Sequence, residues 1–187
     1  MPKLDRHIAD IRGPHEHAAY DGRADEAEVR AKRLDVIAKA AYNNLRAYSN
    51  CCRSTLWALL THLPIEGEDA LKASSTLAGG IAGSGETCGA VLGALMAIGC
   101  AVGPEDPTER GTDARRLASS FVERFVDRFG TTRCYGLQEA TIGWRCDDPG
   151  LVEKWIAAGG PVACAGICAD AAQIAAELIL DANEFAA

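Results

Sequence analysis

The chain has 187 residues, of which 24% are charged, and a formal net charge of −7. This acidic balance excludes a general nucleic-acid-binding protein, because neutralising phosphates requires a basic surface. A hydrophobic content of 48% is enough for a folded core, and only 6% of the residues are aromatic. Alanine is very common, and it favours helices where strands prefer branched and aromatic residues, so we expect an all-α protein.

The first 23 residues are predicted to form a polar arm, and residues 24–187 a single helical domain. Nothing at the start has the apolar core of an export signal, which predicts a cytoplasmic protein. The longest nearly apolar run covers residues 88–102. It is too short to span a bilayer comfortably, so we expect no membrane insertion. Three histidines lie in the arm and are more typical of solvated loops than of a metal site: His7, His15 and His17.

Hydrophobic periodicity predicts a compact bundle of about six to seven helices around a buried central helix rich in Gly and Cys. A long helix begins near Ala24. Its apolar stripe consists of Leu34, Ile37, Ala38, Ala41 and Leu45. Ser49 and Asn50 are expected to cap a second helix over 51–62, which could instead continue the first. A short helix follows over 66–76.

Residues 79–85 are predicted to be a flexible glycine loop, after which Thr87 caps the central helix that starts at Cys88. Gly89 and Gly93 lie one turn apart on this helix. Because glycine destabilises a helix, two of them on one face indicate that another backbone comes close. The loop has no preceding strand and no Lys-Ser/Thr ending, so a nucleotide site is not favoured.

The second half of the chain is predicted to contain three further helices and a short element that holds Cys134. Leu117, Phe121, Phe125 and Val126 face inward on an amphipathic helix over 112–129, which Gly130 ends. Thr131 or Thr132 is expected to cap the short element. Residues 143–150 look irregular, 151–158 form a short helix, and Pro161 opens a last helix over 162–181. We find no convincing strand pair.

Eight cysteines in a reducing compartment indicate metal binding or redox chemistry more often than a disulfide framework, although several could simply pack as small hydrophobes. The predicted elements place four of them in the first turn of a helix: Cys51, Cys88, Cys134 and Cys164. The partial positive charge of a helix N-terminus favours thiolate, the form that binds metals and attacks disulfides. We expect these helix starts to converge, with free backbone N–H groups there and in the glycine loop bonding to sulfur.

Spacing alone is less decisive. The chain has no Cys-x2-Cys pair, no ferredoxin run and no haem attachment site. Cys164 and Cys168 share one helix face, whereas Cys51 and Cys52 point apart. Cys100 resembles a core residue, and Cys146 fits either a site or a loop.

Residues 79–93 read Gly79-Gly80-Ile81-Ala82-Gly83-Ser84-Gly85-Glu86-Thr87-Cys88-Gly89-Ala90-Val91-Leu92-Gly93. They resemble the central signature of the redox-active C_GCAxxG_C_C family. An upstream Asn-Cys, a Phe-Gly-x-x-x-Cys and a late cysteine in an Ala-rich helix match as well. The resemblance covers about residues 34–180. It implies a helical protein with four shared cysteines, which are Cys51, Cys88, Cys134 and Cys168.

A similar domain occurs in split-Soret cytochromes c, which carry haem and an iron–sulfur centre; without an attachment motif, we expect no haem here. Four additional cysteines leave open a larger cluster or a substituted ligand: Cys52, Cys100, Cys146 and Cys164.

Three functions follow as hypotheses. The first is an iron–sulfur protein that transfers electrons to a redox partner protein. Its ligands would be Cys51, Cys88, Cys134 and Cys168 or Cys164, and its cofactor-contacting glycines Gly83, Gly85 and Gly89. The second is a metal-free thiol–disulfide protein, and the third is a helical interaction protein with structural cysteines. The charged arm and first long helix could also mediate homodimerisation.

Overall fold

The computed structural model describes residues 26–184, with side chains placed as far as residue 182. The chain divides at Lys32 into two units, and of the first only the opening turns of α2 fall among the described residues. Everything below concerns the second unit. The predicted arm over residues 1–23, with its three histidines, lies outside the described residues, and the predicted domain boundary stays a prediction.

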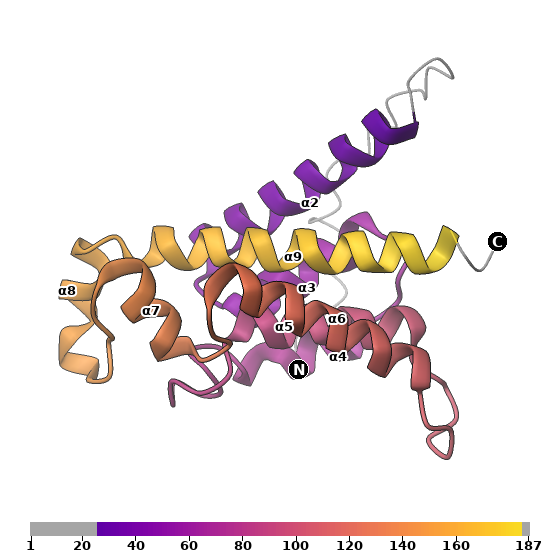
Figure 1. The fold of residues 1–187 in the computed structure, drawn as a ribbon. Helices are drawn as coiled ribbons and strands as arrows, with labels where there is room; N and C mark the ends of the chain where they lie inside the picture. The colour runs from indigo at the N-terminus through magenta and orange to yellow at the C-terminus, as the bar shows by residue number, and fades with distance from the viewer. Residues whose placement is uncertain (1–25, 185–187) are drawn as a thin grey trace, which may run out of the picture. The chain divides into compact units, whose positions relative to one another are not determined.

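The described residues are all-α and include no strand, which confirms the predicted fold class (Figure 1). The α-helices are α2 (Glu26–Tyr48), α3 (Cys51–His62), α4 (Glu68–Ala73), α5 (Gly89–Val102), α6 (Thr112–Phe129), α7 (Cys134–Ile142), α8 (Val152–Ala157) and α9 (Gly160–Glu184). Two short 3₁₀ turns follow α4 and precede α8: η1 (Ser74–Thr76) and η2 (Pro149–Leu151). The described helices number eight rather than six to seven because the short element that holds Cys134 is itself a helix, α7.

Two separate helices, α2 and α3, are joined by a sharp break. Four members of the predicted apolar stripe of α2 are buried: Leu34, Ile37, Ala41 and Leu45. After Tyr48 the chain turns at Ser49, whose φ is +53°, and the helix cannot continue. Asn50 then caps α3, and its side-chain oxygen accepts a hydrogen bond from the backbone N–H of Arg53 at 3.0 Å. The predicted Asn50 cap is confirmed, and the alternative of one continuous helix is wrong.

The centre of the unit is a close contact between α3 and α5. A Cβ added to Gly93 would lie 2.4 Å from the backbone oxygen of Cys52, and one added to Gly89 would lie 2.3 Å from the sulfur of Cys51. These distances are shorter than any real carbon contact, so only glycine allows the two helices to approach this closely. The close approach predicted from the two glycines, and a buried central helix, are therefore confirmed.

The long helix α9 packs along α3, α5 and α6 (Figure 1). Its contact face is built largely from alanines, with Ala165, Ala171, Ala172, Ala175 and Ala176 all fully buried. By length and composition alone, Gly160–Ala182 is apolar enough to cross a membrane, and half of its most apolar stretch is buried against the other helices. This helix is longer than the apolar run at 88–102, so the absence of membrane insertion stays a prediction.

The amphipathic helix α6 buries three of the four predicted inward residues, Leu117, Phe121 and Phe125. Val126 is 37% exposed, so its predicted inward position is wrong. The helix ends at Gly130 with a φ of +76°, which confirms the predicted glycine stop.

Candidate thiol site

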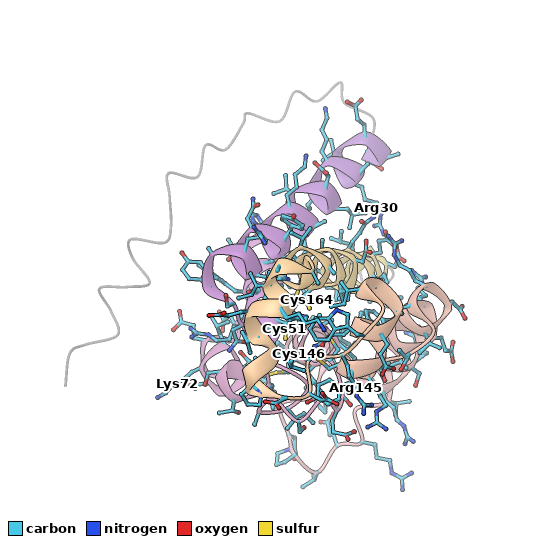
Figure 2. All side chains as sticks on the ribbon, turned by 90° about the vertical axis from the view of Figure 1, so that its left-hand side faces the viewer. Arg30, Cys51, Lys72, Arg145, Cys146 and Cys164 are labelled. Atoms are coloured by element: carbon cyan, nitrogen blue, oxygen red, sulfur yellow. The ribbon has the colours of Figure 1, made fainter. Side chains whose placement is uncertain are left out.

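Five cysteines from four helices form a group centred on Cys51. Figure 2 labels two of them, Cys51 and Cys164. Cys51 is the first residue of α3, Cys88 is the N-cap of α5, and Cys134 is the first residue of α7. Cys164 and Cys168 lie in α9, four residues apart. The negative charge of Cys51 raises the pKa of each of the other four thiols, which places them within electrostatic reach of Cys51. It also raises the pKa of the adjacent Cys52, whose sulfur instead lies near Met96. The first five cysteines form one group. We call this group the thiol site.

Cys51 is the thiol of the group that ionises most readily. The Cys88 thiol donates a hydrogen bond to its sulfur and lowers the pKa of Cys51 to about 6, although burial opposes the shift. Backbone N–H groups of Gly79, Cys52 and Cys51 itself lower the pKa further. Two of these N–H groups belong to the first turn of α3, where the helix dipole also favours an anion. At neutral pH Cys51 is therefore a thiolate.

The other members of the site hold their protons. Donating its hydrogen bond to Cys51, together with burial, raises the pKa of Cys88 well above 9.0. Burial is the main cause that raises the pKa of Cys134 to about 11 and of Cys164 to about 12. Cys168 is fully buried, which together with the charge on Cys51 raises its pKa well above 9.0. The site thus combines one thiolate with four protonated thiols.

The glycine loop that precedes Cys88 is a left-handed turn held by hydrogen bonds, rather than the flexible loop expected. Five consecutive residues have positive φ, among them Ile81 at +63° and Ala82 at +52°. For residues other than glycine this region costs about 1–2 kcal/mol each. The N–H groups of residues 81–86 all donate to nearby backbone oxygens, such as Ala82 to Thr76 at 3.0 Å and Glu86 to Gly80 at 3.0 Å. They are therefore not available to bond to sulfur.

The same loop is fastened to the start of α7. Cys134 donates its backbone N–H to Glu86 O at 2.7 Å, and Cys88 donates to Thr132 O at 2.8 Å. Thr87 and Arg133 form an isolated antiparallel bridge. Beside this bridge, the side chains of Arg133 and Glu86 form an ion pair at 2.9 Å. This arrangement fixes Cys88 and Cys134 relative to one another.

The bridge corrects two predicted caps. Cys88 itself, not Thr87, is the N-cap of α5, and Arg133, not Thr131 or Thr132, is the N-cap of α7. The open N–H groups at the start of α7 are satisfied by carbonyls of the glycine loop, so no local capping side chain is needed.

The predicted cofactor-contacting glycines lie in three different surroundings. Gly83 accepts a hydrogen bond from the Tyr135 hydroxyl at 3.2 Å, and a Cβ on Gly85 would lie 2.1 Å from the Tyr135 ring. Gly89 lies directly against the sulfur of Cys51. Two other glycines of the loop lie nearer to the sulfurs: the N–H of Gly79 bonds to the Cys51 sulfur, as expected of a loop N–H group, and a Cβ on Gly80 would lie 2.7 Å from Cys134 Cβ. Neither was among the glycines predicted to contact a cofactor. Their position in the family-like glycine run was the available signal.

The three remaining cysteines have other surroundings. Cys52 is fully buried and its thiol lies 3.9 Å from the Met96 sulfur, and burial raises its pKa to about 12. Burial also raises the pKa of Cys100, whose sulfur packs near Gly67. Cys146 lies in the loop after α7, where its thiol donates to Asp148 O at 3.7 Å.

Cys164 is the fifth residue of α9 because this helix begins at Gly160, before the predicted start at Val162. It therefore lies just past the first turn, and the predicted dipole effect does not reach Cys168, a further turn along. Burial and the neighbouring thiols, rather than a helix N-terminus, set the properties of both thiols.

Within residues 26–184, no three His, Cys, Asp or Glu side chains are arranged to surround a single metal ion. The donor chemistry of the thiol site nevertheless suits a soft, thiolate-binding centre, since all five candidate donors are sulfur.

Comparison with known proteins adds one match. The sequence model of a protein family described as "Putative redox-active protein (C_GCAxxG_C_C)" matches residues 49–178, more than two thirds of the chain. The chain belongs to the C_GCAxxG_C_C family. No curated protein and no solved structure matches it.

The C_GCAxxG_C_C match begins just before Cys51 and ends in α9 beyond Cys168, so it contains the whole thiol site. It starts later than the span near residue 34 inferred from the sequence, and thereby leaves α2 outside. The elements that family membership covers are the ones that bring the five sulfurs together, and redox activity of cysteines is the property by which the family is described.

Proposed function

We propose that this protein is an iron–sulfur redox protein that exchanges electrons with a partner protein in the cytoplasm. The ligands are Cys51, Cys88, Cys134 and one of Cys164 and Cys168. The observation that carries the proposal is the gathering of four protonated thiols around the Cys51 thiolate, with raised pKa values in those four. A bound iron centre brings positive charge that favours thiolate and removes this penalty.

The proposed centre contains several irons rather than a single ion. One ion requires its ligands to converge on one point, and among the described residues no such group exists. In a cluster, different thiolates bind different irons, so the sulfurs that hold it stand farther apart. When bound, such a cluster supplies one-electron transfer.

The chain's own residues prepare the site for this role. Cys51 offers a thiolate at neutral pH, and the Gly79 N–H bonds to its sulfur. Cys88, Cys134 and Cys168 are buried, which limits access of water and oxidants to the sulfurs. Hydrogen bonds to ligand sulfurs and exclusion of water are two means by which a protein sets a cluster's potential.

The test is to purify the full chain anaerobically and measure iron, acid-labile sulfide and the visible spectrum. We expect iron and sulfide in stoichiometric amounts, and their loss in Cys51→Ser. Cys100→Ser is the matched control, because Cys100 lies outside the thiol site, and it should keep the iron. A wild-type protein without iron and sulfide would contradict the proposal.

One observation favours a second candidate, a metal-free thiol–disulfide protein. The Cys88 thiol donates to the Cys51 thiolate, so the two sulfurs are neighbours with unequal pKa values. Cys51 would attack a disulfide of an oxidised partner protein and release one partner thiol. Cys88 would then attack the mixed disulfide, lose its proton, and release the second partner thiol as the Cys51–Cys88 disulfide forms. Loss of two titratable thiols after mild oxidation of the iron-free protein, absent in Cys88→Ser, is the expected result.

A further inference from the structure

Gln138 of α7 is a buried amide beside the thiol site. Its side chain is 9% exposed, and it is one of four buried polar residues in the described part of the chain. Burying an amide is unfavourable unless both of its ends form hydrogen bonds. Gln138 satisfies this requirement with two partners in different parts of the molecule. One is a thiol of the site, and the other is the backbone of the loop that follows α7.

One end of the amide contacts Cys134. The Nε2 group of Gln138 donates to the Cys134 sulfur at 3.7 Å, one turn earlier on the same helix. A hydrogen bond to sulfur stabilises its anionic form, and the same contact lowers the pKa of Cys134 against the larger effect of burial. Gln138 is thus the side chain that favours charge on a sulfur whose other surroundings oppose it.

The other end holds residues 143–148, which we call the 143–148 loop. The Oε1 atom of Gln138 accepts the backbone N–H of Cys146 at 2.7 Å. Outside the site the same loop is held by Arg145, which pairs with Asp147 at 2.9 Å and lies over the Tyr135 ring at 5.7 Å. Figure 2 labels Arg145 and Cys146 on the side of the molecule that faces the viewer.

The two contacts determine the orientation of the amide. A rotated amide would place its NH₂ group against the Cys146 N–H, a second donor, and leave that N–H without its acceptor. Only the orientation with Nε2 on Cys134 satisfies both partners. The contact with the sulfur and the contact with the loop are therefore made together, through one rigid planar group.

We propose that Gln138 is a positioning residue of the thiol site, which fixes the Cys134 sulfur and couples it to the 143–148 loop. The inference deepens the proposed function, and rests on it in so far as Cys134 is taken as a ligand. A more negative sulfur at Cys134 strengthens the Nε2 contact and holds the amide, and with it the Cys146 backbone, in place. The redox state of the site is thereby communicated to an exposed loop.

Two substitutions separate the two contacts. Gln138→Glu keeps an oxygen that can accept from Cys146 and removes the donor to Cys134, whereas Gln138→Met removes both. The control is Gln173→Met, because Gln173 donates to Glu177 at 3.2 Å on α9 and touches neither Cys134 nor the loop. Circular dichroism and thermal unfolding establish that each variant is folded.

The experiment uses the full chain, reduced and freed of metal by chelation. Iodoacetamide labelling at a fixed pH, mapped to each cysteine by peptide mass spectrometry, reports the reactivity of Cys134. Amide hydrogen exchange reports the 143–148 loop. We expect both Gln138 variants to slow labelling of Cys134 roughly three- to tenfold, the effect of losing one ordinary hydrogen bond, without slowing Cys51. Exchange in the loop should rise in Gln138→Met and stay low in Gln138→Glu.

Unchanged labelling of Cys134 in both variants, or an equal change at every thiol of the site, would overturn the inference. An equal effect of Gln173→Met would do the same. Because these measurements need no iron, an iron-free wild type would refute the cluster while leaving this comparison intact. If the protein does hold iron, both variants should also lower its midpoint potential, because a donor to a ligand sulfur favours the reduced centre.

Discussion

The thiol site and the aromatic core of α6 are both buried, yet they are built on opposite principles. In the aromatic core, Phe121 and Phe125 are fully buried and Phe125 stacks on Phe129 with ring centroids 4.7 Å apart. These side chains gain only from leaving water. In the thiol site, burial works against the chemistry, since it is a main cause of the raised pKa values. Hydrophobic packing alone explains why the aromatic core is buried. It does not explain why the thiols of the thiol site are buried together.

The difference also appears in how helices meet. Around α6, large side chains separate the helix from α5 and α9. Between α3 and α5 there is no side chain at all at Gly89 and Gly93, and backbone meets backbone and sulfur directly. The second kind of contact places the Cys51 sulfur directly against α5 at Gly89.

The largest expected effect is in the aromatic core. Phe125→Ala should lower the free energy of unfolding by about 3–5 kcal/mol, because it removes a fully buried ring and leaves a cavity. Urea unfolding measures this loss. Under native conditions the labelling rate of Cys51 should remain that of the wild type; a matching change in Cys51 would show that the two regions are not independent.

The α3–α5 contact offers a smaller but sharper comparison. Gly93→Ala places a methyl group 2.4 Å from Cys52 O and should destabilise the protein by about 1–3 kcal/mol, as overpacking does. Gly99→Ala, on the same helix with nothing within 4 Å of the added carbon, should instead stabilise by about 1 kcal/mol. The unfolding midpoints of the two variants measure this difference. Equal midpoints would contradict the close approach of α5 to α3 at Gly93.

The thiol site should give stability a characteristic pH dependence in metal-free, reduced protein. Cys51 has a pKa of about 6 when folded and 9.0 otherwise, so above pH 6 the unfolded chain binds more protons and stability rises with pH. The sign reverses as the pH approaches 9, because the other four thiols of the site and Cys52 keep protons that the unfolded chain begins to lose; the pKa values of Cys134 and Cys164, for example, are about 11 and 12. Urea unfolding at a series of pH values measures the curve.

Cys51→Ser is the control for this curve, and it should remove the rise above pH 6. Phe125→Ala should shift the whole curve downward without altering its shape. A rise that survives in Cys51→Ser would assign the effect to another group.

The smallest effects are expected from surface ion pairs of the two regions. Arg128 binds Asp170 through two hydrogen bonds of 3.0 and 2.7 Å, whereas the exposed Arg133 makes one bond to Glu86. Arg128→Gln should reduce stability by about 0.5–1 kcal/mol and Arg133→Gln by less, since exposed pairs contribute little. Double-mutant cycles with Asp170→Asn and Glu86→Gln measure the two couplings, and a stronger Arg133 pair would reverse this order.

The parts of the fold that follow from local chemistry could be predicted from the sequence. The stripe of α2 repeats with the helical period, Asn50 caps α3 with its own side chain, and Gly130 ends α6. In each case the cause lies within a few residues of its effect. Gly89 and Gly93 could be interpreted because their destabilising effect on a helix demands a compensating contact.

The parts that were missed depend on contacts distant in sequence. The N–H groups at the start of α7 are satisfied by the glycine loop, so no Thr cap was required. Ile81 and Ala82 adopt a conformation that their own preferences oppose, and only the surrounding hydrogen bonds of the turn impose it. Cys168 joins the thiol site through packing of α9, not through a position at a helix start. Gln138 gave no signal, because its two partners meet only in the folded chain.

The contact between Cys168 and Cys51 joins residues 117 positions apart, with the Cys168 thiol donating to Cys51 O at 3.8 Å. During synthesis Cys51, Cys88 and Cys134 all leave the ribosome before this residue. At the usual rate of translation, Cys51 precedes Cys168 by on the order of ten seconds. For that interval the nascent chain carries Cys51, Cys88 and Cys134 without the helix that will enclose them, so oxidation of these thiols is in competition with the arrival of α9.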